Sequence, residues 1–103
     1  MIVVITDEAE NDLEQIGDFI AQDNPRRAIS FVKELVDRCH RLTEMPRGYP
    51  LLPGWEDVGI RRRRHGDYLI FYRISEAADR IDVLHVLNGA QDYEAILFPT
   101  ERP

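Results

Sequence analysis

The chain has 103 residues, of which 44% are hydrophobic and 31% charged, and its formal net charge is -6. This length supports one hydrophobic core and excludes a second lobe with a cleft between lobes, and the apolar content excludes an intrinsically disordered protein. We therefore predict one globular domain over residues 1–103, with its function on the surface of that domain.

The first predicted element is a strand, and a helix follows it. Ile2 to Ile5 is a run of β-branched residues suited to a buried strand. Thr6 supplies a helix cap, and apolar residues then recur at helical spacing as far as Ile20. The acidic residues between them form a face that we expect to lie in water.

A second helix is predicted directly after Asn24 and Pro25. Asn is a favoured N-cap, and Pro is tolerated at the first helical position because its missing N–H has no partner there. The helix should end by Met45, since Pro46 disfavours helical geometry in the residue before it. The short corner between the two helices indicates an antiparallel helical hairpin.

The second half of the chain predicts a loop, three strands and a short helix. Prolines and glycines mark residues 46–59 as an irregular loop, with Trp55 as its anchor. Strand-like runs follow at residues 60–64, 68–74 and 81–87, and a tight hairpin turn at residues 65–67 joins the first two. Residues 90–98 predict a final short helix.

The strand at residues 68–74 is apolar on both faces. Alternation places Leu69 and Phe71 on one face and Ile70 and Tyr72 on the other. Two helices joined by a short corner cover only one face of a sheet in the simplest packing. The second face needs the chain's own loop and C-terminal helix, or a partner; we expect a partner to cover what this chain leaves open.

Charge is distributed unevenly along the chain. Residues 1–24 carry -7, residues 25–73 carry +5 and residues 74–103 carry -4. The basic segment contains four consecutive arginines, Arg61 to Arg64, which must alternate between the faces of a strand. Guanidinium groups bind phosphates and carboxylates, so this run indicates a contact with nucleic acid or with an acidic protein. The alternative is an edge strand that uses charge to prevent sheet-to-sheet aggregation.

The sequence indicates no metal site, no cofactor and no membrane segment. The three histidines are widely separated, and none has a second ligand at metal spacing. Cys39 is the only cysteine and lies on the apolar stripe of its helix, pointing away from His40, so neither a disulfide nor a Cys-His nucleophile is expected. Residues 1–5 do not form a signal peptide, and no apolar run reaches bilayer length. We expect a cytoplasmic protein.

The order of these elements, together with several short segments, resembles the ParE branch of the RelE/ParE toxin superfamily. The matching segments cover nearly the whole chain and include Asp12-Leu13, Asn24-Pro25, Ile60-Arg61, residues 68–73 and residues 86–92. The resemblance implies an α+β fold in which an N-terminal strand precedes a helical hairpin packed on an antiparallel sheet, with a short C-terminal helix.

The same resemblance implies the toxin of a type II toxin-antitoxin module, of the kind also called a plasmid stabilisation protein. Its partner would be a ParD-like antitoxin, with a ribbon-helix-helix domain, that wraps around the toxin in a hetero-oligomeric complex. Operator DNA would be contacted only through that antitoxin. ParE-type toxins are understood to inhibit DNA gyrase, whereas RelE-type toxins cut messenger RNA on the ribosome.

The residues favour the gyrase-binding function over ribonuclease activity. Metal-free RNA cleavage needs groups that move protons and stabilise a charged phosphorane. Enzymes that resemble this chain but are of the RelE type use arginines, lysines and a tyrosine for these steps. At such positions this chain has Leu69, Gln91 and Leu97 instead. Only Arg62 lies close to a basic catalytic position. We therefore expect a binding protein with no catalytic residues. The alternatives are a RelE-like ribosome-dependent endoribonuclease and a degenerate, non-toxic co-repressor that binds the antitoxin.

We expect the contacts to the antitoxin or to the target to come from three places: the arginine run, the outer apolar face and the segment before the last helix. The residues are Arg61, Arg62, Arg63, Arg64, Leu69, Phe71, Arg73, Gln91 and Asp92.

Overall fold

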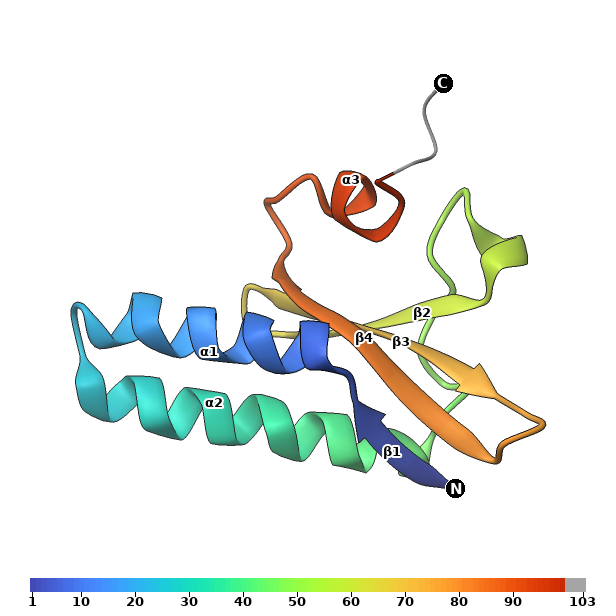
Figure 1. Cartoon of the computed structure of the whole chain (residues 1–103), viewed down its shortest axis with the longest axis horizontal. Helices are drawn as coiled ribbons and strands as arrows, with labels where there is room; N and C mark the ends of the chain where they lie inside the picture. Colours follow the sequence, from blue (N-terminus) through green and yellow to red (C-terminus); the bar gives the residue numbers. More distant parts are fainter. Residues whose placement is uncertain (100–103) are drawn as a thin grey trace.

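The computed structural model describes residues 1–99 and confirms the α+β fold (Figure 1). The elements are β1 (Ile2–Ile5), α1 (Asp7–Ala21), α2 (Pro25–His40), η1 (Arg41–Glu44), η2 (Glu56–Val58), β2 (Ile60–His65), β3 (Tyr68–Ser75), β4 (Arg80–Asn88) and α3 (Tyr93–Leu97), where η denotes a 3-10 helix. No helix in this part of the chain is both long enough and apolar enough to span a bilayer.

The sheet has four strands in the order β1-β4-β3-β2. Strands β2, β3 and β4 form the expected antiparallel meander. Strand β1 differs from the expectation of an antiparallel sheet, because it pairs in parallel with β4. The chain between β1 and β4 contains the helical hairpin, the loop and strands β2 and β3, and this long connection permits a parallel pair, which a tight turn could not join.

Capping interactions fix the start of both long helices where the sequence predicts them. The Thr6 hydroxyl accepts a hydrogen bond of 3.2 Å from the Ala9 N–H at the start of α1. The Asn24 side chain accepts one of 3.1 Å from the Arg27 N–H, with Pro25 in the first turn of α2. These bonds satisfy backbone donors that have no partner inside the helix.

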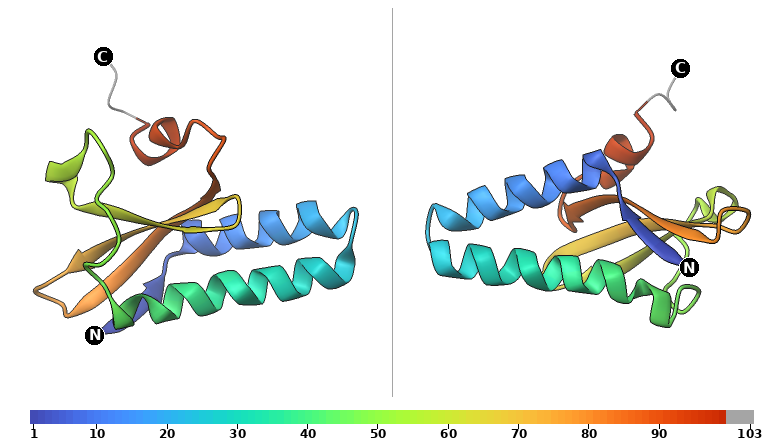
Figure 2. Two further views of the ribbon diagram at one scale, coloured as in Figure 1. Left: turned by 180° about the vertical axis from the view of Figure 1, so that it is seen from behind. Right: turned by 60° about the horizontal axis from the view of Figure 1, so that its bottom comes forward.

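Helices α1 and α2 lie side by side on one face of the sheet (Figure 2), which we call the helix face. The larger core lies between them and the strands, and its buried residues include Leu13, Ile16, Phe31, Leu35, Leu42, Ile70, Tyr72, Ile81, Val83 and Val86. The Tyr72 hydroxyl donates a 2.6 Å hydrogen bond to the Pro46 carbonyl, which ties the start of the loop to this core. Burial raises the pKa of Tyr72 to about 12, so the phenol remains a donor at neutral pH.

The opposite face, which we call the outer face, is covered by the chain itself, and the expected open apolar face is therefore wrong at its centre. Leu69 and Phe71 are only 3% and 0% exposed. The loop at residues 46–59 folds back onto β2, where the Leu52 N–H donates to the Ile60 carbonyl at 2.8 Å. Trp55 of this loop then stacks on Phe98, which follows α3, with ring centroids 3.9 Å apart. Loop and α3 thus form the second cover (Figure 1).

The N-terminal strand is at the edge of the sheet, which changes the burial predicted for it. Val3 and Ile5 pack against the core of the helix face. Ile2 and Val4 point the other way and are 64% and 38% exposed. The prediction of a strand is confirmed, but only alternate side chains of that strand are buried.

Candidate partner-binding site

The four arginines of β2 alternate between the two faces, as the sequence predicts. Arg61 and Arg63 point to the helix face, where Arg61 Nη1 donates to the Tyr49 carbonyl at 2.8 Å and Arg63 Nη1 donates to the Arg38 carbonyl at 3.2 Å. The Arg63 guanidinium also lies over the Tyr49 ring, 5.0 Å from its centroid. These two arginines hold the loop and the last turn of α2 together, so we place them in the framework and not in the contact surface.

Arg62 and Arg64 point to the outer face, and Arg62 lies beside α3. Arg62 Nη1 donates to the Tyr93 hydroxyl at 2.9 Å, and Arg64 Nη1 donates to the Gly66 carbonyl at 3.3 Å. Both side chains line a hollow of about 250 Å³ whose other walls are Tyr49, Pro50 and Leu69. Each guanidinium keeps further N–H donors that these single bonds do not use. We call these two side chains the outer arginine pair.

The outer arginine pair has no carboxylate partner within residues 1–99. The arginine ion pairs in this part of the chain instead use Arg27, Arg38, Arg41, Arg47 and Arg80. The loop already pairs with the first half of β2 through the 3.1 Å bond from the Arg62 N–H to the Pro50 carbonyl, so backbone pairing protects that part of the edge. The positive charge on the outer face is therefore available to an anionic partner.

Arg73 lies on the same outer face, farther along β3. It pairs across the strands with Ile60, two residues from Arg62 along β2. Its side chain is exposed and lines a groove of about 470 Å³ between the sheet and α3, together with Leu84 and Ile96. This groove combines an apolar wall with a guanidinium, which suits a peptide carrying both apolar and acidic side chains.

The other predicted contact residues have different positions. Leu69 and Phe71 are buried beneath the outer cover, so they support the site and cannot touch a partner. Asp92 is the N-cap of α3 and accepts a 3.4 Å hydrogen bond from the Ala95 N–H. Gln91 is exposed, and its side-chain oxygen accepts a 3.0 Å bond from the Asn88 N–H.

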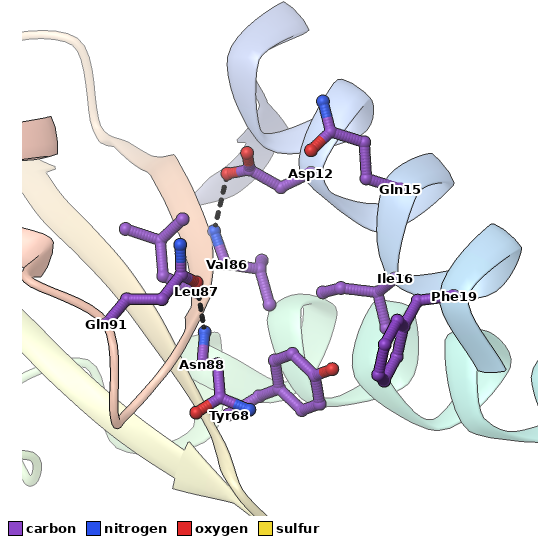
Figure 3. A pocket seen from close by; sticks show the side chains of 9 residues that line it. All are labelled: Asp12, Gln15, Ile16, Phe19, Tyr68, Val86, Leu87, Asn88 and Gln91. Atoms are coloured by element: carbon purple, nitrogen blue, oxygen red, sulfur yellow. Dashed lines mark hydrogen bonds between the residues drawn. The ribbon is translucent and has the colours of Figure 1, made fainter.

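Gln91 borders a second hollow, which sequence reasoning did not find (Figure 3). It has a volume of about 310 Å³ and lies where α1 meets β4 and the turn that follows it. Its lining residues are Asp12, Gln15, Ile16, Phe19, Tyr68, Val86, Leu87, Asn88 and Gln91. Amide groups and a phenol surround an apolar floor, an arrangement that can hold an apolar side chain and hydrogen-bond the backbone beside it.

Asp12 fixes the geometry of this second hollow. Its Oδ2 accepts a 2.9 Å bond from the Val86 N–H and lies 2.7 Å from His85 Nδ1 (Figure 3 draws the bond to Val86). The acid therefore joins α1 to β4 across a separation of more than seventy residues in the chain. In the sequence, Asp12-Leu13 is one of the segments that carry the family resemblance. That resemblance draws attention to Asp12 but does not reveal that its carboxylate joins α1 to β4.

A second carboxylate joins the other helix to the hairpin between β2 and β3. Glu34 Oε2 lies 2.7 Å from Arg27 Nη1, and Glu34 Oε1 lies 2.9 Å from His65 Nε2. The hydrogen bonds from Arg27 and then from His65 lower the pKa of Glu34 to about 2. Within residues 1–99 no group of three His, Cys, Asp or Glu side chains is placed to hold a metal ion.

Comparison with known proteins identifies a family whose model matches most of this chain. The family model described as the ParE toxin of the type II toxin-antitoxin system, parDE, matches residues 3–93. The search among curated proteins gave no match.

Two solved structures share the fold. The chromosomal ParDE system from P. aeruginosa aligns with a TM-score of 0.70 at 20% identity, covering 85% of this chain and 95% of that one. The RelBE2 toxin-antitoxin complex from Mycobacterium tuberculosis aligns with a TM-score of 0.62 at 25% identity, covering 87% of this chain and 92% of that one. Both solved structures therefore share the arrangement of elements described above.

Proposed function

The chain belongs to the ParE toxin family of type II toxin-antitoxin systems, and from this premise we propose that it inhibits DNA gyrase by binding and is neutralised by an antitoxin encoded beside it. We further propose that it acts in the cytoplasm, that the antitoxin is ParD-like with a ribbon-helix-helix domain, and that operator DNA is reached only through that antitoxin. The two similar structures are described as toxin-antitoxin systems, which supports a hetero-complex as the resting form.

The observation that carries the proposal is the set of arginines on the outer face without carboxylate partners. Arg62, Arg64 and Arg73 all point to that face, and within residues 1–99 none forms an ion pair. The chain as a whole is acidic, at -6, so this concentration of positive charge is local. An acidic segment of the antitoxin would meet these guanidinium groups while its apolar side chains cover the groove beside Ile96.

Binding, and not catalysis, is the activity that these residues support. The position where a RelE-type enzyme carries an arginine is the buried Leu69, and an apolar side chain cannot move a proton. Gln91 uses its side-chain oxygen to hold the turn after β4. Asp92 caps α3, so it too is engaged within the fold.

One contact favours the ribonuclease as the second candidate function. Arg62 Nη1 lies 2.9 Å from the hydroxyl of Tyr93, which places a cation beside a phenol on the outer face. The family resemblance places Leu97 where the nucleases carry their terminal tyrosine, whereas Tyr93 lies one turn earlier on α3. A single such pair supplies charge stabilisation but lacks a second group for proton transfer, so we rank this function below gyrase binding.

The test is expression of the chain with and without the adjacent open reading frame. Expression alone should arrest growth, co-expression should restore it, and the purified chain should inhibit gyrase supercoiling in vitro. Normal growth together with normal supercoiling at high levels of the chain would refute the toxin function. Messages cut at defined positions after induction, with supercoiling unaffected, would instead establish the ribonuclease.

A charge-matched pair of variants locates the site. Arg62→Ala with Arg64→Ala removes the outer arginine pair, whereas Arg26→Ala with Arg41→Ala removes the same charge from α2 and the turn that follows it. We expect the first variant to lose antitoxin rescue or toxicity and the second to behave as the wild type. Equal effects of the two variants would show that total charge, and not this site, matters.

A further inference from the structure

The second hollow, beside Gln91, is open because within residues 1–99 no strand continues the sheet along the last part of β4. Strand β1 pairs with β4 only as far as Val83. Beyond that residue, side chains take the backbone N–H groups of this edge. The Asp12 carboxylate accepts from Val86, and the Gln91 side chain accepts from Asn88. A partner would therefore bind here through side chains, and not by adding a strand to the sheet.

The carboxylate of Asp12 is the charged group of this hollow, since the other described residues that line it are neutral. The Asp12 side chain is only 12% exposed. Its contacts with the Val86 N–H, at 2.9 Å, and with His85 Nδ1, at 2.7 Å, both use Oδ2, so Oδ1 keeps its lone pairs. A mostly buried carboxylate interacts strongly with a nearby positive charge, because little solvent screens the pair. The hollow thus offers a place for a cation.

The walls of the hollow suit the long stem and the head of an arginine side chain. Phe19 of α1 and Tyr68 of β3 supply aromatic rings, and the Tyr68 hydroxyl points towards Phe19 in Figure 3. Phe19 is 67% exposed, so its ring is available to a partner. A guanidinium stacks on aromatic rings, and the methylenes of an arginine pack along apolar surface. The volume of about 310 Å³ leaves room for one such side chain.

Amide groups complete the set of hydrogen-bonding partners. Gln91 and Asn88 use their side-chain oxygens inside the turn after β4, which leaves their side-chain N–H groups to donate to a backbone carbonyl of a partner. Gln15 lies one turn after Asp12 on α1 and is exposed, so its oxygen can accept from a guanidinium. The hollow therefore provides groups for both the side chain and the backbone of an inserted residue.

We propose that the second hollow binds an arginine side chain of the toxin's target, with the guanidinium at Asp12 Oδ1 and its stem between Phe19 and Tyr68. This inference rests on the proposed function, because it names the surface through which the chain contacts gyrase. The outer arginine pair lies on the face of the sheet opposite α1, so target and antitoxin use separate surfaces.

Charge around the hollow favours the target over the antitoxin as the occupant. Residues 1–24, which include α1, contain seven acidic residues and no lysine or arginine. An acidic segment of the antitoxin, which suits the outer arginine pair, is repelled by this surface. Gyrase acts on DNA, and proteins hold the phosphates of DNA with lysine and arginine side chains. A basic surface of the target is therefore complementary to the α1 side of this chain.

Inhibition of gyrase supercoiling by the purified full chain tests the proposal. Phe19→Ala removes an aromatic wall, and Gln15→Arg places a guanidinium within reach of Asp12, where it occupies the hollow from within. Each variant should raise the concentration needed for half-inhibition by about tenfold or more, because stacking or charged contacts with the target are lost. The affinity of each variant for the antitoxin should stay near the wild-type value.

Two matched controls carry the same chemical changes outside the hollow. Gln22→Arg adds the same charge at the exposed end of α1, and Met45→Ala shortens another exposed apolar side chain; neither residue lines the hollow. Both controls should inhibit gyrase as the wild type does. Wild-type inhibition by Phe19→Ala and Gln15→Arg would overturn the inference and leave the proposed function intact. So would weaker antitoxin binding with unchanged inhibition, which would assign the hollow to the antitoxin.

A second arm does not depend on gyrase. In NMR titrations of the full chain, N-acetyl-arginine amide should shift the backbone amide signals of Val86 and Asn88 and the side-chain amide signals of Gln15 and Gln91. N-acetyl-citrulline amide has nearly the same shape without the charge and should shift them much less. Equal shifts with the two probes, or no shift at these residues, would overturn the inference. A wild type that does not inhibit supercoiling but shows the arginine-specific shifts would instead refute gyrase as the target and retain the arginine site.

Discussion

The two faces of the sheet are covered in very different ways, although the same strands supply both. The helix face is sealed by α1 and α2, each with a capped start and a continuous apolar stripe. The outer face is sealed by an irregular loop and the five-residue helix α3, through half-buried side chains such as Trp55, Tyr93 and Phe98. The larger core lies on the helix face, so we expect this face to contribute most of the stability, and we propose that partner binding uses the thinner cover.

The largest expected effect is the loss of a buried side chain on the helix face. Leu35 is fully buried between α2 and the sheet, so Leu35→Ala should lower the free energy of unfolding by about 2 to 5 kcal/mol. Urea denaturation followed by circular dichroism measures this change. A loss well below 1 kcal/mol would contradict the view that this face holds the fold together.

A smaller effect is expected from the anchor of the outer cover. Trp55 is half-buried and stacks on Phe98, so Trp55→Ala should lower the free energy of unfolding by about 1 to 2 kcal/mol. The same variant should expose Leu69 and Phe71, which increased binding of a hydrophobic dye would report. If Trp55→Ala destabilises the chain as much as Leu35→Ala does, the two faces contribute equally and the comparison fails.

The smallest effect concerns pH and the contact between α2 and the β2-β3 hairpin. Because the pKa of Glu34 is lowered from 4.5 to about 2, its carboxylate contributes stability that is fully present above pH 4.5 and is lost as the pH falls towards 2. The Glu34 side chain is 35% exposed, and solvent screens its ion pairs, so we expect this contribution to be modest. Glu34→Gln should flatten the decline in stability over that pH window. Parallel acid profiles for the variant and the wild type would contradict this role.

The elements that the sequence predicted correctly depend on local signals. Thr6 and Asn24 cap helices through bonds within three residues, and Gly66 takes a positive φ of 60° in the hairpin turn. Alternation along β2 also showed that the arginines divide between faces. It could not show which pair faces outward, because that depends on the register against β3 and on which face the helices cover.

What the sequence could not show depends on contacts between distant segments. The stacking of Trp55 on Phe98 closes the outer face, and no periodicity in either segment marks it. The hollow beside Gln91 likewise unites α1, the start of β3 and the end of β4, joined through the bonds of Asp12. Its residues lie in three parts of the sequence, so only the fold brings them together.

The most direct test of the central claim is the affinity of the purified chain for its antitoxin, measured by isothermal titration calorimetry at two salt concentrations. Replacing Arg62 and Arg64 by Ala should weaken binding by about tenfold to a hundredfold and reduce its dependence on salt, because charged contacts on the outer face are lost. Replacing Arg26 and Arg41 should leave both quantities near the wild-type values. Wild-type affinity and salt dependence in the Arg62/Arg64 variant would show that the antitoxin does not use the outer arginine pair.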